Sequence, residues 1–414
     1  MSDEFIWHPY TQQKIAGPNI SVSRASGAYL FDENNSAYLD AISSWWVNLH
    51  GHCHPTIVKA IAAQAAQLEQ VIFAGFTHPK AMALAASLLQ WLPHYGKVFF
   101  SDNGSTATEA AVKMALQFWA NKNEPRHTLI AFREGYHGDT FGAMSVSARD
   151  VFTAPFQRLL FDVVFIDAPV AGKELQTLQQ LDAALQQQPA AFIFEPLVLG
   201  SAGMLMYSAE VLETMIRRCR QHGVLTIADE VFTGFGRTGK MFATDHLSTR
   251  PDLLCLSKGI TGGFLPMGVT LATHEVYEPF HHQEKYRMLF HGHSYTGNAL
   301  ACAAAVASLQ VFEEESTLEK VTQISNWQQD AVATAQHFPH LKHARSCGTI
   351  FAVDYVLPGN DGYLHPMRDQ LYRHFMAQKI VLRPLGNTVY IVPPYCITID
   401  ELHRVHEAIF NCHL

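Results

Sequence analysis

The sequence predicts an α/β protein with a large domain on a mostly parallel sheet and a smaller α+β domain. Three observations predict this class. Short apolar strands alternate with helical patterns through the middle of the chain, this order changes after about residue 300, and 414 residues exceed what one ordinary core holds. We expect residues 1–50 to join the small domain, residues 51–300 to form the large domain, and residues 301–414 to complete the small one.

The first predicted elements form a small antiparallel unit within residues 20–41. Two short alternating runs, Ala28–Phe31 and Ala37–Asp40, flank the turn signal Asp-Glu-Asn-Asn. Strands of the large domain follow, separated by helical patterns: Val98–Ser101, Thr128–Phe132, Ala191–Phe194, Val224–Ala228, Leu253–Ser257 and Val269–Ala272. Because helices separate them, these strands indicate a largely parallel sheet.

The last third of the chain predicts a different arrangement. It begins with a helix over Ala299–Phe312 that is rich in small residues and too short to span a bilayer. Shorter strands follow at Gly348–Tyr355 and Thr388–Val392, and a final helix begins at Asp400. We expect the N-terminal segment to return to this α+β domain.

Composition excludes several classes of protein. The net charge is -8 and no basic block occurs, which argues against a protein that binds nucleic acid or anionic membranes. The seven cysteines are scattered and never in Cys-x-x-Cys spacing, as in reduced cytosolic proteins. The first residues lack the basic and apolar regions of a signal peptide, so we expect a cytoplasmic protein.

The end of the strand at Val98–Ser101 indicates a phosphate site. The chain runs from Asp-Asn-Gly-Ser-Thr straight into a helix, for which we expect a capping box from Thr106 to Glu109. Gly104 and Ser105 then lie at a helix N-terminus, whose free N–H groups and dipole favour phosphate. A plain helix cap explains the same residues, and taken alone it is the commoner explanation.

Two further strand ends carry candidate residues. Tyr136 lies between glycines after the strand at Thr128–Phe132, where its ring could stack on a flat ligand or simply pack. Glu195 closes the apolar strand Ala191–Phe194, and a carboxylate there needs a partner or a chemical role.

The strongest pair is an acid and an amine on successive strands. Asp229 ends one strand, and in LLCLSKGITGG the next strand delivers Lys258 to a glycine-rich turn. In an open sheet both face the crevice at the strand ends. A buried lysine with a lowered pKa can bind an aldehyde covalently, and a carboxylate can keep a ring nitrogen protonated, which together predict pyridoxal 5'-phosphate. We expect the glycines to let the backbone approach the cofactor and to give Lys258 room to move.

Two other patterns are weaker. Gly234-Phe-Gly236-Arg-Thr-Gly239 matches the dinucleotide-binding string and would favour a nicotinamide oxidoreductase, but no clear helix follows and the acidic residues precede the glycines. The 23 histidines include His50, His52 and His54 but lack a recognised ligand framework, so we expect no metal site.

The ordered set of motifs resembles one family. GSTATEAAVKMA, GYHGDTFGAMS, FIFEP, IADEVFTGFGRTGKMFA, LSKGITGG and HGHSYTGNALACAAA occur in the order found in class III aminotransferases of fold type I. The similarity covers essentially the whole chain. It implies a pyridoxal phosphate-dependent transaminase, and a catalytically inactive binding scaffold is hard to reconcile with Asp229 and Lys258 in register.

The resemblance also implies roles for individual residues. Lys258, Asp229 and Tyr136 are the implied catalytic residues. The implied cofactor-binding residues are Gly104, Ser105, Tyr136, Asp229, Lys258, His293 and Ser294. The implied substrate-binding residues are Tyr10, Trp45, Trp46, Tyr136, Arg237, Gly292, Arg383 and Tyr390. Arg383 would hold a carboxylate through two hydrogen bonds, whereas Arg237 could instead form a salt bridge with a neighbouring acid.

Within the class, three segments narrow the resemblance. WHPYTQ, SSWWVNLHGHCHP and VLRPLGNTVYIVPPY are similar to the members that aminate 8-amino-7-oxononanoate with S-adenosylmethionine as donor, in biotin biosynthesis. Two alternatives stay open: another ω-aminotransferase reaction, or the same acceptor with lysine as donor. The resemblance further implies a homodimer in which Gly292–Ser294 complete the other subunit's cofactor site.

Overall fold

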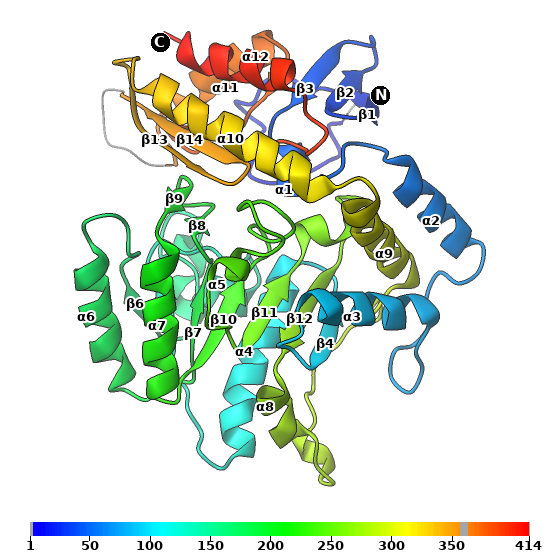
Figure 1. The fold of residues 1–414 in the computed structure, drawn as a ribbon, viewed down its shortest axis with the longest axis vertical. Helices are drawn as coiled ribbons and strands as arrows, with labels where there is room; N and C mark the ends of the chain where they lie inside the picture. Colours follow the sequence, from blue (N-terminus) through cyan, green and yellow to red (C-terminus); the bar gives the residue numbers. More distant parts are fainter. Residues whose placement is uncertain (1–2, 357–362, 414) are drawn as a thin grey trace.

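The computed structural model describes residues 3–356 and 363–413. Its larger part, the lower half of Figure 1, is built on a seven-stranded sheet with the order β4-β12-β11-β10-β7-β5-β6. The strands are β4 (Lys97–Ser101), β5 (Leu129–Phe132), β6 (Val163–Ile166), β7 (Ala191–Phe194), β10 (Leu225–Asp229), β11 (Leu253–Leu256) and β12 (Gly268–Ala272). All run parallel except β12, which is antiparallel to both of its neighbours.

Helices bury both faces of this sheet. Alternate strand residues enter two cores: Phe192 and Leu254 pack with the side of α6 and α7, whereas Ile193 and Leu253 pack with α4. Strands buried on both faces read as continuous apolar runs, which is why the sequence revealed them. The helices of this part are α2 (Pro55–Ala65), α3 (Pro79–Trp91), α4 (Gly104–Asn121), α5 (Phe141–Ser145), α6 (Glu174–Leu185), α7 (Ala209–Gln221) and α8 (His274–Tyr277).

Short elements fill the connections. A hairpin pairs β8 (Val198–Leu199) with β9 (Leu205–Met206). The 3₁₀ helices cover Ala154–Leu159, Ala243–His246, Lys258–Thr261, Glu278–Phe280 and Lys285–Arg287. In the part of the chain that the structure describes, no helix is long and apolar enough to cross a membrane.

The smaller part, at the top of Figure 1, joins the two ends of the chain. One sheet has the order β1-β2-β3-β15 and another β13-β14-β16. Their strands are β1 (Val22–Ser26), β2 (Tyr29–Asp32), β3 (Ala37–Asp40), β13 (Leu341–Cys347), β14 (Ile350–Tyr355), β15 (Ile380–Val381) and β16 (Thr388–Ile391). The helices are α1 (Ser43–Trp46), α10 (Thr317–Ala335), α11 (Arg368–Ala377) and α12 (Ile399–Phe410), and α9 (Ala299–Glu314), which leads into α10, packs against α2 and α3 of the larger part.

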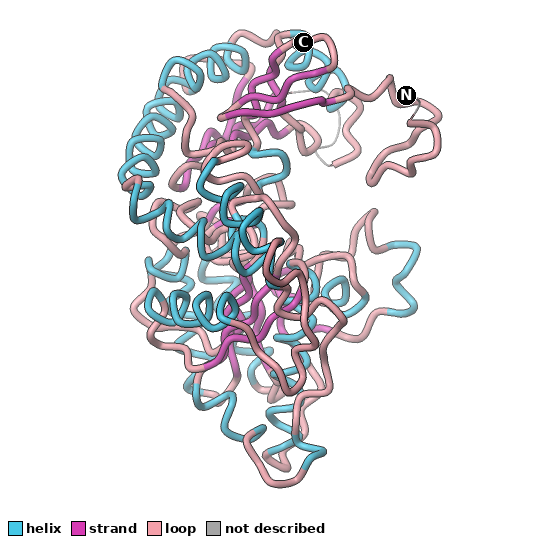
Figure 2. Tube along the Cα trace, turned by 90° about the vertical axis from the view of Figure 1, so that its right-hand side faces the viewer, coloured by secondary structure: helices cyan, strands magenta, loops and turns pink. Residues whose placement is uncertain are grey.

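The pairing of β3 with β15 links the N-terminal and C-terminal segments. Leu39 lies opposite Ile380 in a parallel register, and the two termini lie near each other at the same end of the molecule in Figure 2. The large sheet lies within residues 97–272. The domain boundaries at residues 50 and 300 stay predictions.

The α/β fold class and the predicted strands are confirmed, with some differences. The strands β6 and β13 and the two-residue strands β8, β9 and β15 were not predicted from the sequence. In β13 the run Leu-Lys-His-Ala-Arg-Ser-Cys is mostly half-buried and does not alternate cleanly between apolar and polar residues, so it lacks the usual strand pattern. The expected Thr106–Glu109 capping box is wrong: α4 begins three residues earlier, at Gly104, and the capping box joins Asn103 to Thr106.

Candidate active site

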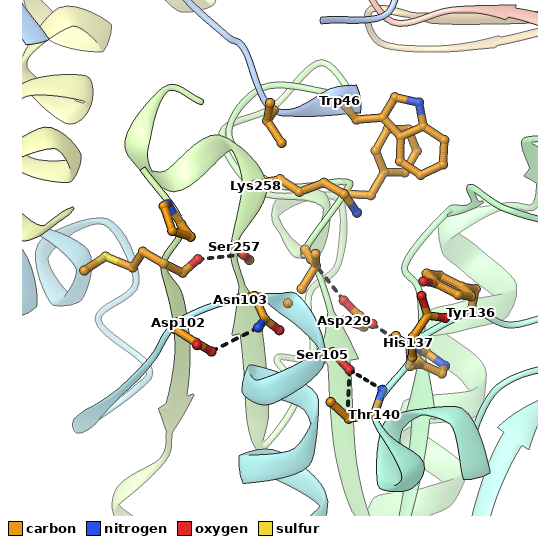
Figure 3. A pocket seen from close by; sticks show the side chains of 18 of the residues that line it. Trp46, Asp102, Asn103, Ser105, Tyr136, His137, Thr140, Asp229, Ser257 and Lys258 are labelled. Carbon is orange, nitrogen blue, oxygen red and sulfur yellow. Dashed lines mark hydrogen bonds and ion pairs between the residues drawn. The ribbon is translucent and has the colours of Figure 1, made fainter. Parts of the chain in front are cut away.

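The strand ends of the large sheet surround a cavity of about 690 Å³. Figure 3 shows Lys258, Asp229, Tyr136 and Ser105 around it. Its lining residues are Trp46, Val47, Asp102, Asn103, Gly104, Ser105, Tyr136, His137, Gly138, Asp139, Thr140, Glu195, Asp229, Val231, Phe232, Ser257, Lys258, Gly263, Phe264, Leu265, Pro266 and Met267. The cavity therefore lies where ligands bind in open α/β sheets.

The N-terminus of α4 forms one wall. Asn103 Oδ1 accepts from the N–H of Thr106 at 3.0 Å, and Thr106 Oγ1 accepts from the N–H of Asn103 at 3.1 Å. A Cβ at Gly104 would lie 2.5 Å from Val231 Cγ1, and one at Gly138 would lie 2.3 Å from Ser105 Oγ. Only glycine fits at both positions, so bare backbone faces the cavity at a helix N-terminus, as a phosphate requires.

A buried hydrogen-bond network fixes the loop beside this wall. The N–H of Thr140 donates to Ser105 Oγ at 3.0 Å, and the Thr140 hydroxyl donates to Glu109 Oε1 at 2.6 Å. Glu109 Oε1 also accepts from the N–H groups of Gly142, at 2.7 Å, and Ala143, at 3.1 Å. Glu109 therefore caps α5 and ties the loop carrying Tyr136 to α4.

Asp229 is oriented by two partners at the end of β10. It is 4% exposed; Oδ1 accepts from the N–H of Val231 at 3.0 Å, and Oδ2 lies 2.7 Å from His137 Nδ1. The dashed line in Figure 3 marks this second contact. His137 is itself held, because its N–H donates to Ser147 Oγ at 2.8 Å. A carboxylate fixed in this way can stabilise a positive charge at one place in the cavity.

Lys258 follows β11 and enters the cavity from the opposite side. Its amine lies 5.1 Å from the ring centre of Trp46 and 5.9 Å from that of Phe232. Burial lowers the pKa of Lys258, while the charges of Asp229 and Glu195 oppose that shift. A larger fraction of the amine is therefore unprotonated at neutral pH than in an exposed lysine, as a nucleophile requires.

The glycines after Lys258 accommodate a second loop. A Cβ at Gly259 would lie 3.0 Å from Leu49 Cδ1, and one at Gly263 would lie 2.9 Å from the backbone of Asn48. Gly263 also has a φ of +88°, which disfavours other residues. The structure thus shows a packing reason for these glycines that the sequence analysis did not consider.

Glu195 lies buried at the end of β7. Its two oxygens accept from the N–H groups of Tyr136, at 2.9 Å, and Gly200, at 3.0 Å. Burial raises the pKa of Glu195 to about 7, and His137 opposes the shift. Glu195 therefore anchors the loop of Tyr136 from the side opposite Glu109.

The predicted substrate-side residues form a group beside the cavity. Trp46, which lines it, donates from Nε1 to the Tyr390 hydroxyl at 3.3 Å. Trp45 is 39% exposed, with the Arg383 guanidinium 4.8 Å from its ring centre. Tyr10 packs edge-on against Trp45 at 5.6 Å and donates a hydrogen bond to Asp139. The fold thus brings all five residues from three distant segments of the chain to one side.

Four predicted residues lie elsewhere. Arg237 is 1% exposed and donates to the carbonyls of Pro393, at 2.6 Å, and Asn48, at 3.1 Å. Among the residues that the structure describes it has no ion pair, so it links the two parts of the molecule through backbone oxygens. Gly292–Ser294 do not line the cavity of their own chain within residues 3–356 and 363–413.

The sequence analysis missed His137, Thr140, Val231 and Phe232. His137 and Thr140 stand within the quoted GYHGDTFGAMS, next to the strand end that drew attention to Tyr136. Val231 and Phe232 directly follow Asp229. Their positions after the ends of β5 and β10 could have identified them, because residues after parallel strand ends face the same crevice.

The cavity fits pyridoxal phosphate on three structural grounds. Two glycines leave bare backbone at the N-terminus of α4, suited to the phosphate. Asp229 is fixed by His137 and Val231 on one side, suited to a protonated ring nitrogen. Lys258 supplies an amine with a lowered pKa on the other side.

Comparison with known proteins identifies the family. The profile of the class III aminotransferases matches residues 10–412. The adenosylmethionine-8-amino-7-oxononanoate aminotransferase of Synechococcus elongatus is 46% identical over 99% of this chain and 98% of its own length, and that of Geobacter sulfurreducens is 37% identical over 96% and 93%.

Solved structures agree with these sequences. The crystal structure of the enzyme with the same name from Methanocaldococcus jannaschii has a TM-score of 0.93 and 35% identity over 98% of this chain and 96% of that one. A PLP-bound amine transaminase from an uncultivated Pseudomonas species has a TM-score of 0.92 and 29% identity over 99% and 98%. The chain belongs to the class III aminotransferases, which depend on pyridoxal phosphate.

Proposed function

We propose that this aminotransferase converts 8-amino-7-oxononanoate to 7,8-diaminononanoate with S-adenosylmethionine as amino donor, a step of biotin biosynthesis. The observation that carries the proposal is the shared cavity of Lys258, Asp229 and the α4 N-terminus, flanked by Trp45, Trp46 and Arg383. Relatives named for this reaction, at 35 to 46% identity over nearly the whole chain, support the choice of substrates.

The bound cofactor would supply a reactive aldehyde and an electron-withdrawing ring. The residues of this chain would hold it in three places. The N–H groups at the start of α4, with the Ser105 hydroxyl, would bind the phosphate. Asp229 would keep the ring nitrogen protonated, and Tyr136 would pack against the ring.

Lys258 would bind the cofactor and carry the proton. Its amine would also be the base that takes a proton from the substrate carbon and the acid that gives the proton up again. The ring centres of Trp46 and Phe232 lie 4.4 Å apart, and the two rings exclude water from the side of Lys258 that they cover.

The substrate side matches an apolar chain that ends in a carboxylate. Trp45 and Trp46 would bound the chain, and the guanidinium of Arg383, whose five N–H donors form a fixed fork, would bind the carboxylate. If Arg383 holds the carboxylate of a long keto acid, the keto group at the other end of the acid can lie beside the amine of Lys258.

Two more expectations belong to the proposal. We propose a homodimer in which Gly292, His293 and Ser294 complete the partner subunit's phosphate site. The exposure of Tyr286, at 66%, and of Phe290, at 61%, supports an interface there, since large apolar side chains of a monomer are seldom so exposed together. Seven free cysteines support a cytoplasmic enzyme.

The first test concerns the reaction. Purified wild-type enzyme with pyridoxal phosphate should produce 7,8-diaminononanoate from 8-amino-7-oxononanoate and S-adenosylmethionine. Lys258→Ala should lose both the visible absorbance of the covalently bound cofactor and turnover, by at least about 10³-fold. Turnover with lysine but not with S-adenosylmethionine would show that lysine is the amino donor. Absence of turnover with 8-amino-7-oxononanoate would favour another ω-aminotransferase reaction.

A further inference from the structure

The loop that carries Trp45 and Trp46 has an unusual backbone. Within residues 43–53, the non-glycine residues Ser43, Ser44, Trp46 and Cys53 have φ values of 52°, 62°, 67° and 57°. The left-handed region is disfavoured for residues with a Cβ, so a cluster of four needs surroundings that enforce it. Short polar residues tolerate it best, and a tryptophan there is exceptional.

One buried carboxylate holds both ends of this loop. Asp40, at the end of β3, is fully buried. Its Oδ2 accepts from the N–H of Ser44 at 2.6 Å and from His52 Nε2 at 2.9 Å, while Oδ1 accepts from the N–H of Ile42 at 3.2 Å. Asp40 therefore joins the start of the loop, at Ser44, to its end, at His52.

Asn48 closes the network from inside the loop. Its Oδ1 accepts from the N–H of Gly51 at 2.9 Å, which leaves its Nδ2 to donate to His52 Nδ1 at 3.2 Å. His52 then donates from Nε2 to Asp40, so the contacts assign it the neutral tautomer with the proton on Nε2. His52 therefore stands between the other two side chains and is oriented by both of them.

The same loop meets the cavity and the lysine turn. Trp46 and Val47 line the cavity. The backbone of Asn48 lies against Gly263, where a Cβ would come within 2.9 Å of it, and Leu49 lies against Gly259. Movement of the loop therefore moves the wall that faces Lys258.

We propose that Asp40, Asn48 and His52 form a polar clasp whose function is to set substrate selectivity, by holding the loop that carries Trp45 and Trp46 in its strained backbone conformation beside the cavity. None of the three lines the cavity, so they are positioning residues that act through the two tryptophans. The inference rests on the proposed function only in that the tryptophans face the substrate chain.

Asp40→Asn is the sharpest variant. Both carboxylate oxygens accept N–H groups, so either orientation of an amide would set its NH₂ against a donor. His52→Leu removes the two hydrogen bonds of His52, to Asp40 and Asn48, but is the milder variant because Asp40 keeps its bonds to the N–H groups of Ile42 and Ser44. His52→Gln retains a donor and an acceptor. Asp32→Asn is the matched control: Asp32 also accepts backbone N–H groups, from Asn34 and Ser36, but in a turn of the same sheet away from the loop.

The measurement is the half-reaction of cofactor-loaded enzyme with 1-aminononane and with 1-aminopropane, followed by the cofactor absorbance. The long amine would extend past Trp46 toward Trp45, whereas the short one would reach no farther than Trp46, which lies beside Lys258. Asp40→Asn and His52→Leu should lower the rate constant for the long amine by about 10-fold or more and that for the short amine by less than about 2-fold. His52→Gln should recover part of the loss, and Asp32→Asn should leave the ratio unchanged.

Equal losses with both amines, or loss of bound cofactor, would overturn the inference, because the clasp would then support only the fold or the lysine turn. Failure of the clasp inference can be distinguished from failure of the proposed function. Failure of the wild type to turn over 8-amino-7-oxononanoate would overturn the proposed substrate, whereas the ratio for the two plain amines would still test the clasp.

Discussion

The arrangement of Asp229 and Lys258 follows from their places on neighbouring parallel strands. Ala228 and Asp229 pair with Leu254 and Cys255, so the two strands end at the same edge, and Lys258 lies just beyond it. The acid and the amine therefore line the same cavity. That arrangement suits one flat cofactor between them, bonded to one and polarised by the other.

Glu195 gives a prediction on pH. Burial raises its pKa to about 7, from 4.5. Between these values the folded protein holds more protons than the unfolded chain, so the stability that this group contributes is complete below pH 4.5 and falls as the pH rises to 7. We therefore compare the unfolding temperatures of the wild type and Glu195→Gln. The wild-type temperature minus the variant temperature should be smaller at pH 8 than at pH 5.

Calorimetry of both proteins across this range checks the prediction. Burial also raises the pKa of Glu230 to about 7, but that group is common to both proteins and cancels in the difference. Glu124→Gln, at an exposed position, is the control and should follow the wild type. If the difference between the unfolding temperatures of the wild type and Glu195→Gln does not change with pH, the raised pKa of Glu195 is wrong.

At the scale of the element, α4 has both a structural and a binding end. Asn103→Ala removes the bond to the N–H of Thr106 and should destabilise the protein by about 1 kcal/mol. It should also weaken pyridoxal phosphate binding, since Asn103 lines the cavity. Thr398→Ala removes the equivalent cap of α12, away from the cavity, and should cost similar stability with unchanged cofactor affinity. Equal cofactor affinity in the two variants would show that Asn103 at the N-terminus of α4 does not contribute to cofactor binding.

The turn after Lys258 gives a second prediction at this scale. Gly263 and Gly172 have nearly the same φ, +88° and +85°, but only Gly263 has a neighbour where a Cβ would stand. Gly172→Ala should cost about 1 kcal/mol from backbone conformation alone. Gly263→Ala should cost at least about 3 kcal/mol and lower activity, because Asn48 must also move. Denaturant unfolding and activity assays compare the two, and equal costs would show that the loop does not press on the turn.

The sequence revealed elements whose signal is local and left out those that depend on distant contacts. The buried strands β7 and β11 are unbroken apolar runs, and Lys258 stands out as a single charge after one of them. Asp40 gave no signal, and His52 drew attention only as one of several clustered histidines, because their importance comes from hydrogen bonds across a loop with positive φ values. Arg237 could not be placed for a similar reason: its partners are backbone carbonyls, which leave no trace in composition.

At the scale of the whole molecule, the two ends of the chain close over the large sheet. Ser43 Oγ donates to the carbonyl of Val392 at 2.8 Å, and the N–H of Tyr395 donates to the carbonyl of Leu49 at 2.6 Å. The C-terminal segment thus supports the tryptophan loop from behind. A substrate side built from both ends of the chain explains why Tyr10, Trp45, Arg383 and Tyr390 meet although up to 380 positions separate them.

The last prediction concerns the proposed dimer. Lys258→Ala lacks the lysine, and a His293→Ala/Ser294→Ala double variant lacks the residues expected to complete the partner subunit's phosphate site; each alone should be inactive or nearly so. In a mixed dimer, the site that keeps Lys258 receives an intact His293 and Ser294 from the other chain. Random mixing at equal amounts should therefore restore about a quarter of the wild-type sites. Co-expression with two affinity tags isolates the mixed dimer for assay. If each site were built from one chain only, the mixed dimer would contain no complete site, and the absence of recovered activity would exclude the shared arrangement.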